Sequence, residues 1–209
     1  SEDFSPISKF FNLHELAVED CFTPGHFPKL EEYANCVFLM LRGLKSISEI
    51  EEIRDHEELV EEYNSEKLTR GLGIFLGTHF IITHRLYEVS WLDAFVRQYH
   101  QNSELHQTLS PADLTMRICN TLTSRFLRGV NYFEDEIVQM EDAVIKSSGR
   151  FDMLDLLDMK RDLNILMSIS RDLKNIFLRL SSEPSLIPNR PLRRYFKNIE
   201  DRSSMTTQS

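Results

Sequence analysis

Residues 110–149 read SPADLTMRICNTLTSRFLRGVNYFEDEIVQMEDAVIKSSG, and this stretch dominates the architecture of the chain. It opens with Ser110-Pro111-Ala112-Asp113, which is typical of a helix start: a serine N-cap, a proline at the first helical position and an acid two residues later. The apolar residues that follow recur every three or four positions, at Ile118, Leu122, Phe126, Val130, Phe133, Ile137, Met140 and Val144. This spacing predicts one amphipathic helix of about 35 residues, ended at Ser147-Ser148-Gly149.

A second long helix is predicted from Phe151 to about Leu180. Its apolar residues continue the same pattern, at Leu163, Leu166, Ile169, Leu173 and Phe177. Because a short loop joins the two helices, we expect them to lie antiparallel. Pro184 and Pro188 end the second helix, and Pro191 begins a last predicted helix that reaches Asp201.

The part of the chain before residue 105 mixes short helices with strands. Residues 8–21 carry apolar side chains at three- and four-residue steps and predict short helices. Residues 36–41 form a short apolar run with a preference for β-structure, which predicts a buried strand. Residues 72–76 and 80–83 are two apolar runs around a glycine-containing turn, which predicts a β-hairpin. A further amphipathic helix is predicted over residues 89–99.

The chain is acidic, with a formal net charge of −9. A phosphate backbone is held by clustered lysine and arginine, so this balance argues against nucleic acid as a partner. An acidic surface instead favours cations or basic partners. Many of the acids crowd residues 46–67, which we interpret as a solvated surface excursion.

Other features argue against several classes of protein. The three cysteines (Cys21, Cys36 and Cys119) are scattered, which fits a reducing compartment rather than a disulfide or zinc framework. The sequence has no signal-peptide pattern and no apolar run of about 18 residues, so we expect a soluble polypeptide. It also has no phosphate-cradling glycine loop and no evident nucleophile–histidine pair. We therefore expect no enzyme, with no catalytic and no cofactor-binding residues.

Six stretches resemble, in the same order, motifs of the CorA family of divalent-cation channels. They are FNLHELAVEDCF (11–22), PKLEEY (28–33), VFLMLR (37–42), LRGVNYFEDEI (127–137), KRDL (160–163) and RYFKN (194–198). Two positions depart from the family pattern, which has a proline where this chain has Glu15 and an arginine where it has Phe27. Each motif is weak alone, and the ordered set over residues 8 to 201 is more specific.

The resemblance implies an α+β fold. We expect an αβα sandwich-type domain, a small sheet with flanking helices, over residues 1–105. A long antiparallel helical hairpin and the start of a stalk helix are expected over residues 106–201, with a tail at residues 202–209. The family continues its last helix into two membrane spans joined by a Gly-Met-Asn loop, and neither occurs in this sequence.

The resemblance also implies a function: the regulatory cytoplasmic domain of a magnesium or cobalt channel. Family members are homopentamers, and Mg²⁺ bound between neighbouring subunits keeps the channel closed; Co²⁺ or another divalent cation is a further candidate ligand. The whole protein would lie in the inner (plasma) membrane with this part on its cytoplasmic face. Without the membrane helices, we expect the chain to be a monomer or dimer.

Carried over by motif, Glu19 and Asp20 match the acidic pair on one side of the family's interface site. The facing carboxylate is replaced by Asn198, and Asp201, three residues further along the helix, is the substitute that we consider. A third family carboxylate falls near Asn120, which is also neutral. The expected metal site is therefore Glu19, Asp20, Asn198 and Asp201. His14 is interpreted as a packed or capping histidine rather than a ligand.

Two alternatives stay open. A ZntB-like zinc transporter shares the architecture, although zinc prefers cysteine and histidine ligands to an all-oxygen site. A soluble helical scaffold that binds a partner through its long hairpin would explain the helical pattern but not the ordered motifs.

Overall fold

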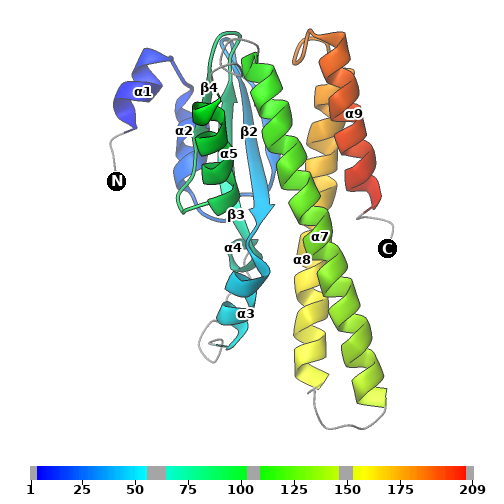
Figure 1. Cartoon of the computed structure of the whole chain (residues 1–209). Coiled ribbons are helices and arrows are strands. Elements are labelled where there is room, and N and C mark those ends of the chain that lie inside the picture. Colours follow the sequence, from blue (N-terminus) through cyan, green and yellow to red (C-terminus); the bar gives the residue numbers. More distant parts are fainter. Residues whose placement is uncertain (1–3, 56–64, 103–108, 146–152, 206–209) are drawn as a thin grey trace.

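The computed structural model describes residues 4–55, 65–102, 109–145 and 153–205 (Figure 1). Along the chain the elements are α1 (Ser5–Phe10), α2 (Glu15–Phe22), β1 (Lys29–Glu32), β2 (Val37–Leu44), α3 (Ile47–Asp55), α4 (Ser65–Leu68), β3 (Thr69–Leu76), β4 (Ile81–His84), α5 (Ser90–Gln101), α7 (Pro111–Ile145), α8 (Met153–Ser182) and α9 (Arg190–Met205).

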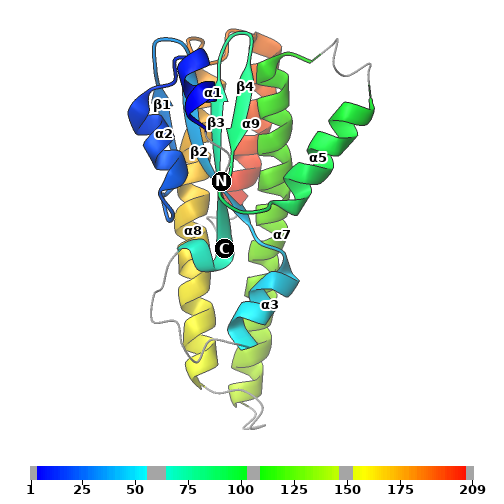
Figure 2. The ribbon, with the colours of Figure 1, turned by 90° about the vertical axis from the view of Figure 1, so that its left-hand side faces the viewer.

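The four strands form one antiparallel sheet in the order β1-β2-β3-β4. β2 is central in this order and pairs along its whole length with β3, for example Leu39 with Ile74. Successive side chains of a strand point to opposite faces. Leu39 and Leu41 accordingly belong to one apolar core, while Phe38 and Met40 belong to another. The sheet is therefore covered on both faces, as an αβα sandwich requires (Figure 2).

One face of the sheet is covered by α2. Ala17 and Cys21 of this helix are buried against Phe38, Met40 and Phe75. The helix comes close because β3 has a glycine beneath it: a Cβ at Gly73 would lie 2.5 Å from the Cys21 Sγ.

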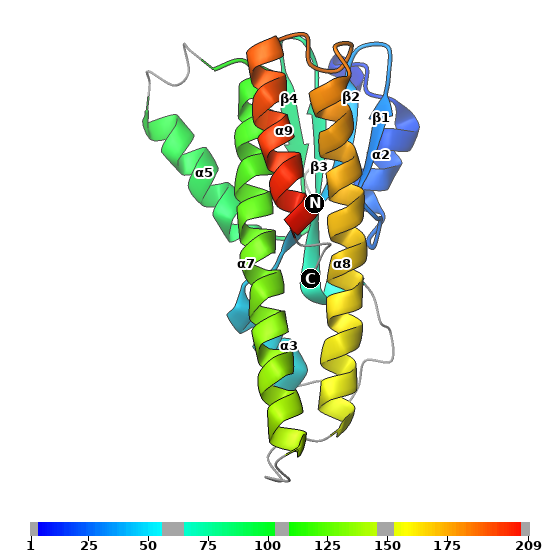
Figure 3. The same cartoon turned by 90° about the vertical axis from the view of Figure 1, so that its right-hand side faces the viewer.

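The other face is covered by the long helices. α7 and α8 lie antiparallel, as the short connection predicts, and α9 lies against both (Figure 3). Their buried apolar residues form one core with the sheet, among them Leu122, Phe126, Phe133, Leu173, Phe177 and Phe196. α7 and α8 also extend past the end of the sheet (Figure 1), where Met140 and Met159 belong to the same core.

The α+β fold and the main elements are confirmed, except that α9 continues past the predicted end at Asp201 to Met205, so the predicted tail of residues 202–209 is helical at its start. At the start of α7 the Ser110 hydroxyl accepts a hydrogen bond from the Asp113 N–H (3.2 Å), while the Asp113 carboxylate accepts from the Ser110 N–H (2.9 Å). This is the reciprocal capping box that the sequence indicates. The predicted turn at Ser147-Ser148-Gly149 and the start at Phe151 lie outside the described residues. Within the described ranges, every helix is too short or too polar to span a lipid bilayer.

Candidate functional site

The acidic pair of the sequence motif lies at the C-terminal end of α2. The helix begins after His14, whose Nδ1 accepts a hydrogen bond from the Leu16 N–H (3.3 Å) and whose ring stacks on Tyr33 at 4.5 Å. His14 is thus a capping and packing residue, as expected. The Glu19 side chain is exposed, and its carboxylate makes no hydrogen bond or ion pair with a residue that the structure describes. Glu19 is a carboxylate open to a ligand from outside the chain.

Asp20 is held differently, because basic side chains of its own chain surround it. The Lys29 Nζ lies 2.6 Å from one carboxylate oxygen and the His26 Nε2 lies 3.2 Å from the other. Lys29 also contacts Glu31 at 3.2 Å, and the Tyr33 hydroxyl donates to Glu31 at 2.7 Å. An ammonium group at this distance offsets most of the attraction that Asp20 offers to a second cation.

The partner positions lie on α9. Asn198 and Asp201 are both exposed, and the Lys197 Nζ lies 3.1 Å from the Asp201 carboxylate. Lys197 also pairs with Glu200, which is 5% exposed. This part of α9 therefore presents an exposed amide, Asn198, with no hydrogen bond to the side chain from the described residues, and an exposed carboxylate, Asp201, that is paired with Lys197.

Asn120, the third position, faces a positive charge. Its side-chain oxygen accepts a hydrogen bond from the Arg202 guanidinium, which also donates to the Ser124 hydroxyl at 3.1 Å. A guanidinium at this place repels a divalent cation. The sequence shows that Asn120 is neutral. Its hydrogen bond with Arg202 could be identified only from the structure.

A single copy of the chain does not bring the two halves of the expected site together. α2 lies on one side of the sheet, while α9 lies on the other, beyond α7 and α8 (Figure 1). Within the part of the chain that the structure describes, no group of three or more histidine, cysteine, aspartate or glutamate side chains could hold a metal ion. An ion bound by both Glu19 and Asn198 would therefore have to lie between two copies of the chain.

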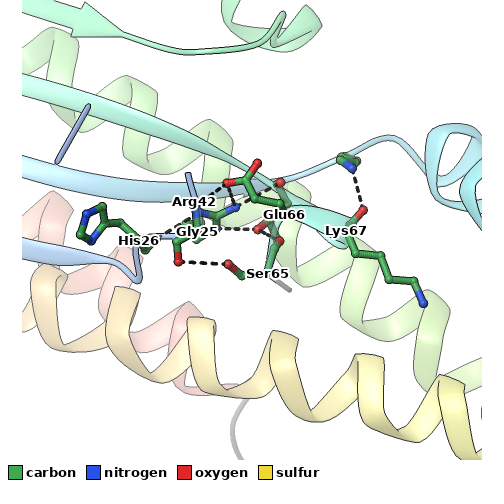
Figure 4. Close-up of polar contacts among 8 residues, drawn as sticks. Gly25, His26, Arg42, Ser65, Glu66 and Lys67 are labelled. Atoms are coloured by element: carbon green, nitrogen blue, oxygen red, sulfur yellow. Dashed lines mark hydrogen bonds and ion pairs between the residues drawn. The ribbon is translucent and has the colours of Figure 1, made fainter. Parts of the chain in front are cut away.

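A buried arginine that the sequence analysis did not single out fixes the loop after α2 (Figure 4). Arg42, on β2, is 1% exposed, and its guanidinium lies 2.6 Å from Glu66 and donates to the Thr69 hydroxyl at 2.7 Å. It also donates to the His26 carbonyl at 3.0 Å, and Glu66 accepts from the Gly25 N–H at 3.0 Å. The network joins β2, α4 and residues 25–26, and so positions the segment that contacts Asp20.

Comparison with known proteins agrees with this architecture. The family model of the CorA-like Mg²⁺ transporter protein matches residues 1–208. YfjQ of Bacillus subtilis, a protein assigned by name to metal ion transport, is 23% identical over 192 residues, covering 92% of this chain and 54% of the relative. This chain thus spans about half the length of the curated relative that it matches.

Two solved structures show the same fold. The complete CorA magnesium transporter of Methanocaldococcus jannaschii superposes with a TM-score of 0.72 at 14% identity, covering 99% of this chain and 60% of that one. The ZntB cytoplasmic domain of Vibrio parahaemolyticus superposes with a TM-score of 0.63 at 13% identity, covering 99% of this chain and 78% of that one. With the family match extending over nearly the whole sequence, this chain belongs to the CorA-like Mg²⁺ transporter family.

Proposed function

We propose that this chain is the cytoplasmic, regulatory part of a divalent-cation channel, and that Mg²⁺ bound between neighbouring copies sets their geometry. Membership of the family supports the transport role. The observation that carries the regulatory part is the placement of the acidic and amide donors. The Glu19 carboxylate is exposed on one side of the sandwich and has no partner in the part of the chain that the structure describes, and Asn198 is exposed on the other side.

The donors fit a hydrated magnesium ion better than zinc. Mg²⁺ keeps several of its waters and is held by one or two carboxylates together with other oxygen ligands. Glu19, Asn198 and Asp201 supply such oxygens. Zinc prefers thiolate and imidazole ligands, and Cys21, Cys36 and Cys119 are all buried in the apolar cores.

Fewer charges are available here than the family motif provides. Lys29 forms an ion pair with Asp20, and Lys197 forms one with Asp201. The Arg202 guanidinium donates a hydrogen bond to the Asn120 side chain. The proposed interface therefore depends on Glu19 more than on any other residue. An ion between two copies would hold them together, and its loss would leave them free to move, which is how ion occupancy becomes a switch of geometry.

The test is the assembly state of the chain with and without the ion. We expect sedimentation velocity at several chain concentrations to show larger assemblies in millimolar Mg²⁺ than in EDTA. Glu19→Gln should remove this response, and Asn198→Asp should shift it to lower Mg²⁺ concentration because it adds a carboxylate. Glu15→Gln is the matched control, since Glu15 is an exposed acid of the same helix outside the proposed site.

Equal sedimentation in Mg²⁺ and EDTA would contradict the proposal, as would an equal loss of response in Glu15→Gln and Glu19→Gln. Parallel titrations with Co²⁺ and Zn²⁺ separate the candidate ions. A response to Zn²⁺ alone would favour the ZntB-like alternative over the magnesium site.

A further inference from the structure

A cavity of about 270 Å³ lies on the α7 side of the sheet, apart from the proposed magnesium site. Five elements contribute to its wall: the end of β2, the start of α3, the start of β3, the start of α5 and the middle of α7. Its lining includes three basic side chains: Lys45 from the connection after β2, Arg70 from β3 and Arg125 from α7. Three basic side chains around one cavity contrast with the net charge of −9 of the chain and make the cavity a candidate site for an anion.

Among the described residues, no carboxylate forms an ion pair with these bases, although buried cations are usually paired. The Nε atoms of Arg70 and Arg125 are buried and have no hydrogen-bond partner among the described residues. The Arg70 guanidinium instead lies 4.6 Å from the centre of the Tyr87 ring. Lys45, which is 7% exposed, donates to the Lys67 carbonyl at 2.7 Å. Burial and the neighbouring Arg70 lower the pKa of Lys45 to about 8, the direction expected when cations share a site.

Two acids also line the cavity. Among the described residues neither forms an ion pair with its bases, although Glu49 lies near enough to Lys45, Arg70 and Arg125 to attract them electrostatically. The Glu49 carboxylate is engaged at the start of α3, where it accepts hydrogen bonds from the Ser46 N–H (2.8 Å) and the Ser46 hydroxyl (2.7 Å). Glu88 is exposed. Within the described ranges, the Arg70 and Arg125 Nε–H groups thus keep hydrogen-bonding capacity that is not used.

We propose that this cavity binds a phosphate group, either free phosphate or the phosphate of a small metabolite. Two guanidinium groups offer the planar donor pairs that match phosphate oxygens, and a lysine adds a third positive charge. The volume is close to the lower end of small-ligand pockets and leaves room beside a single phosphate. Trp91 forms an aromatic part of the wall next to Gly43, a surface on which an organic group can pack.

The experiment uses Trp91 as a reporter, because it is the single tryptophan of the chain and lines the cavity. We expect inorganic phosphate to change its fluorescence saturably, relative to potassium chloride at the same ionic strength. Adenosine monophosphate is titrated in parallel. Tighter binding of the monophosphate assigns the site to an organic phosphate, and equal or weaker binding assigns it to the free ion.

Variants distinguish the site from general charge screening. Arg125→Gln and Arg70→Gln should each weaken phosphate binding about tenfold or more, because each removes a guanidinium–phosphate contact. Glu88→Gln should strengthen it by removing an acid from the rim. Arg117→Gln removes the same charge from an exposed position of the same helix α7 and should leave binding unchanged.

Thermal melting by circular dichroism shows that each variant is folded before it is titrated. The proposal is overturned if phosphate and chloride affect Trp91 equally, or if Arg117→Gln weakens the response as much as Arg125→Gln. Because neither measurement involves magnesium or Glu19, failure here leaves the proposed channel function standing, and the reverse also holds.

Discussion

At the scale of single residues, Arg42 is a buried charge whose partners come from three segments of the chain. Replacing it by methionine keeps most of the apolar stem and removes the guanidinium, so that Glu66 loses its ion pair with Arg42 and the Thr69 hydroxyl loses the hydrogen bond that Arg42 donates. Breaking a buried pair from one side typically costs about 3–5 kcal/mol. Since Glu66 is 19% exposed and can be partly hydrated, we expect Arg42→Met to lower the free energy of unfolding by about 3 kcal/mol.

Urea denaturation followed by circular dichroism measures this loss. Arg117→Gln, an exposed arginine of α7, should stay within about 0.5 kcal/mol of the parent chain. A loss smaller than about 1 kcal/mol in Arg42→Met would show that the buried network contributes little to stability.

The three thiols give a second prediction at this scale. Burial raises the pKa of Cys21 and of Cys119 to about 12 in each case. It also raises the pKa of Cys36. Thiolate is the reactive form, so at pH 8 the folded chain should resist iodoacetamide at all three positions. Mass spectrometry should find no alkylated cysteine in the native chain and three after unfolding in urea. Rapid alkylation of Cys21 in the native chain would contradict the close packing of α2 on β3.

Part of the proposed site follows from residue identities alone, and the rest depends on which side chains pair in the folded chain. That Asn120 and Asn198 are neutral is evident from the motif. The pairs Asp20–Lys29 and Asn120–Arg202 were not predicted, because the partners are separated along the chain and meet through the fold. Glu66 belongs to an acidic run interpreted as solvated, yet it binds the buried Arg42.

At the scale of elements, the contact between α7 and β2 depends on a glycine. A Cβ at Gly129 would overlap the Leu44 side chain, which packs directly over that position. Alanine favours a helix by about 1 kcal/mol over glycine, whereas overpacking costs about 1–3 kcal/mol. Because Leu44 is 5% exposed and enclosed in the core, we expect the clash to prevail and Gly129→Ala to destabilise the chain by about 1–2 kcal/mol.

The double variant Leu44→Ala/Gly129→Ala makes the cause of this loss explicit. Removing the Leu44 side chain opens the space that the new methyl group needs, so the two substitutions should be less damaging together than the sum of the single losses. If the losses of unfolding free energy measured by urea denaturation are purely additive, the new methyl group at position 129 does not clash with the Leu44 side chain.

Helices and strands were predictable from the sequence where their apolar residues follow a regular spacing or form a continuous run. α7 and α8 follow from three- and four-residue steps, and β2, β3 and β4 follow from apolar runs. β1 was not predicted as a strand, because its residues Lys29–Glu32 have no alternation of apolar and polar side chains. It is an edge strand held by pairing with β2 and by Arg179 of α8, which donates to the Leu30 carbonyl at 3.3 Å and lies 2.7 Å from Glu32.

At the scale of the whole molecule, the sandwich separates the two halves of the proposed magnesium site. α2 and α9 lie on opposite sides of the sheet, so an ion that uses both must join two copies. The sequence motifs indicate which residues take part, but they do not determine how copies face each other, since that depends on surfaces rather than on local pattern. A test of the central proposal must therefore detect the proximity of α2 in one copy to α9 in another.

Cross-linking between these helices measures that proximity most directly. Leu16 and Tyr195 are exposed, lie three residues before Glu19 and Asn198, and can be changed to cysteine without touching a proposed ligand. We expect Leu16→Cys/Tyr195→Cys with a short bismaleimide to form covalent oligomers in Mg²⁺ and few in EDTA. Each variant that carries only one of the two added cysteines should remain largely uncross-linked, since the three native cysteines are buried. Absence of oligomers in Mg²⁺ although both thiols react, or the same oligomers in EDTA, would contradict an ion-dependent interface between α2 and α9.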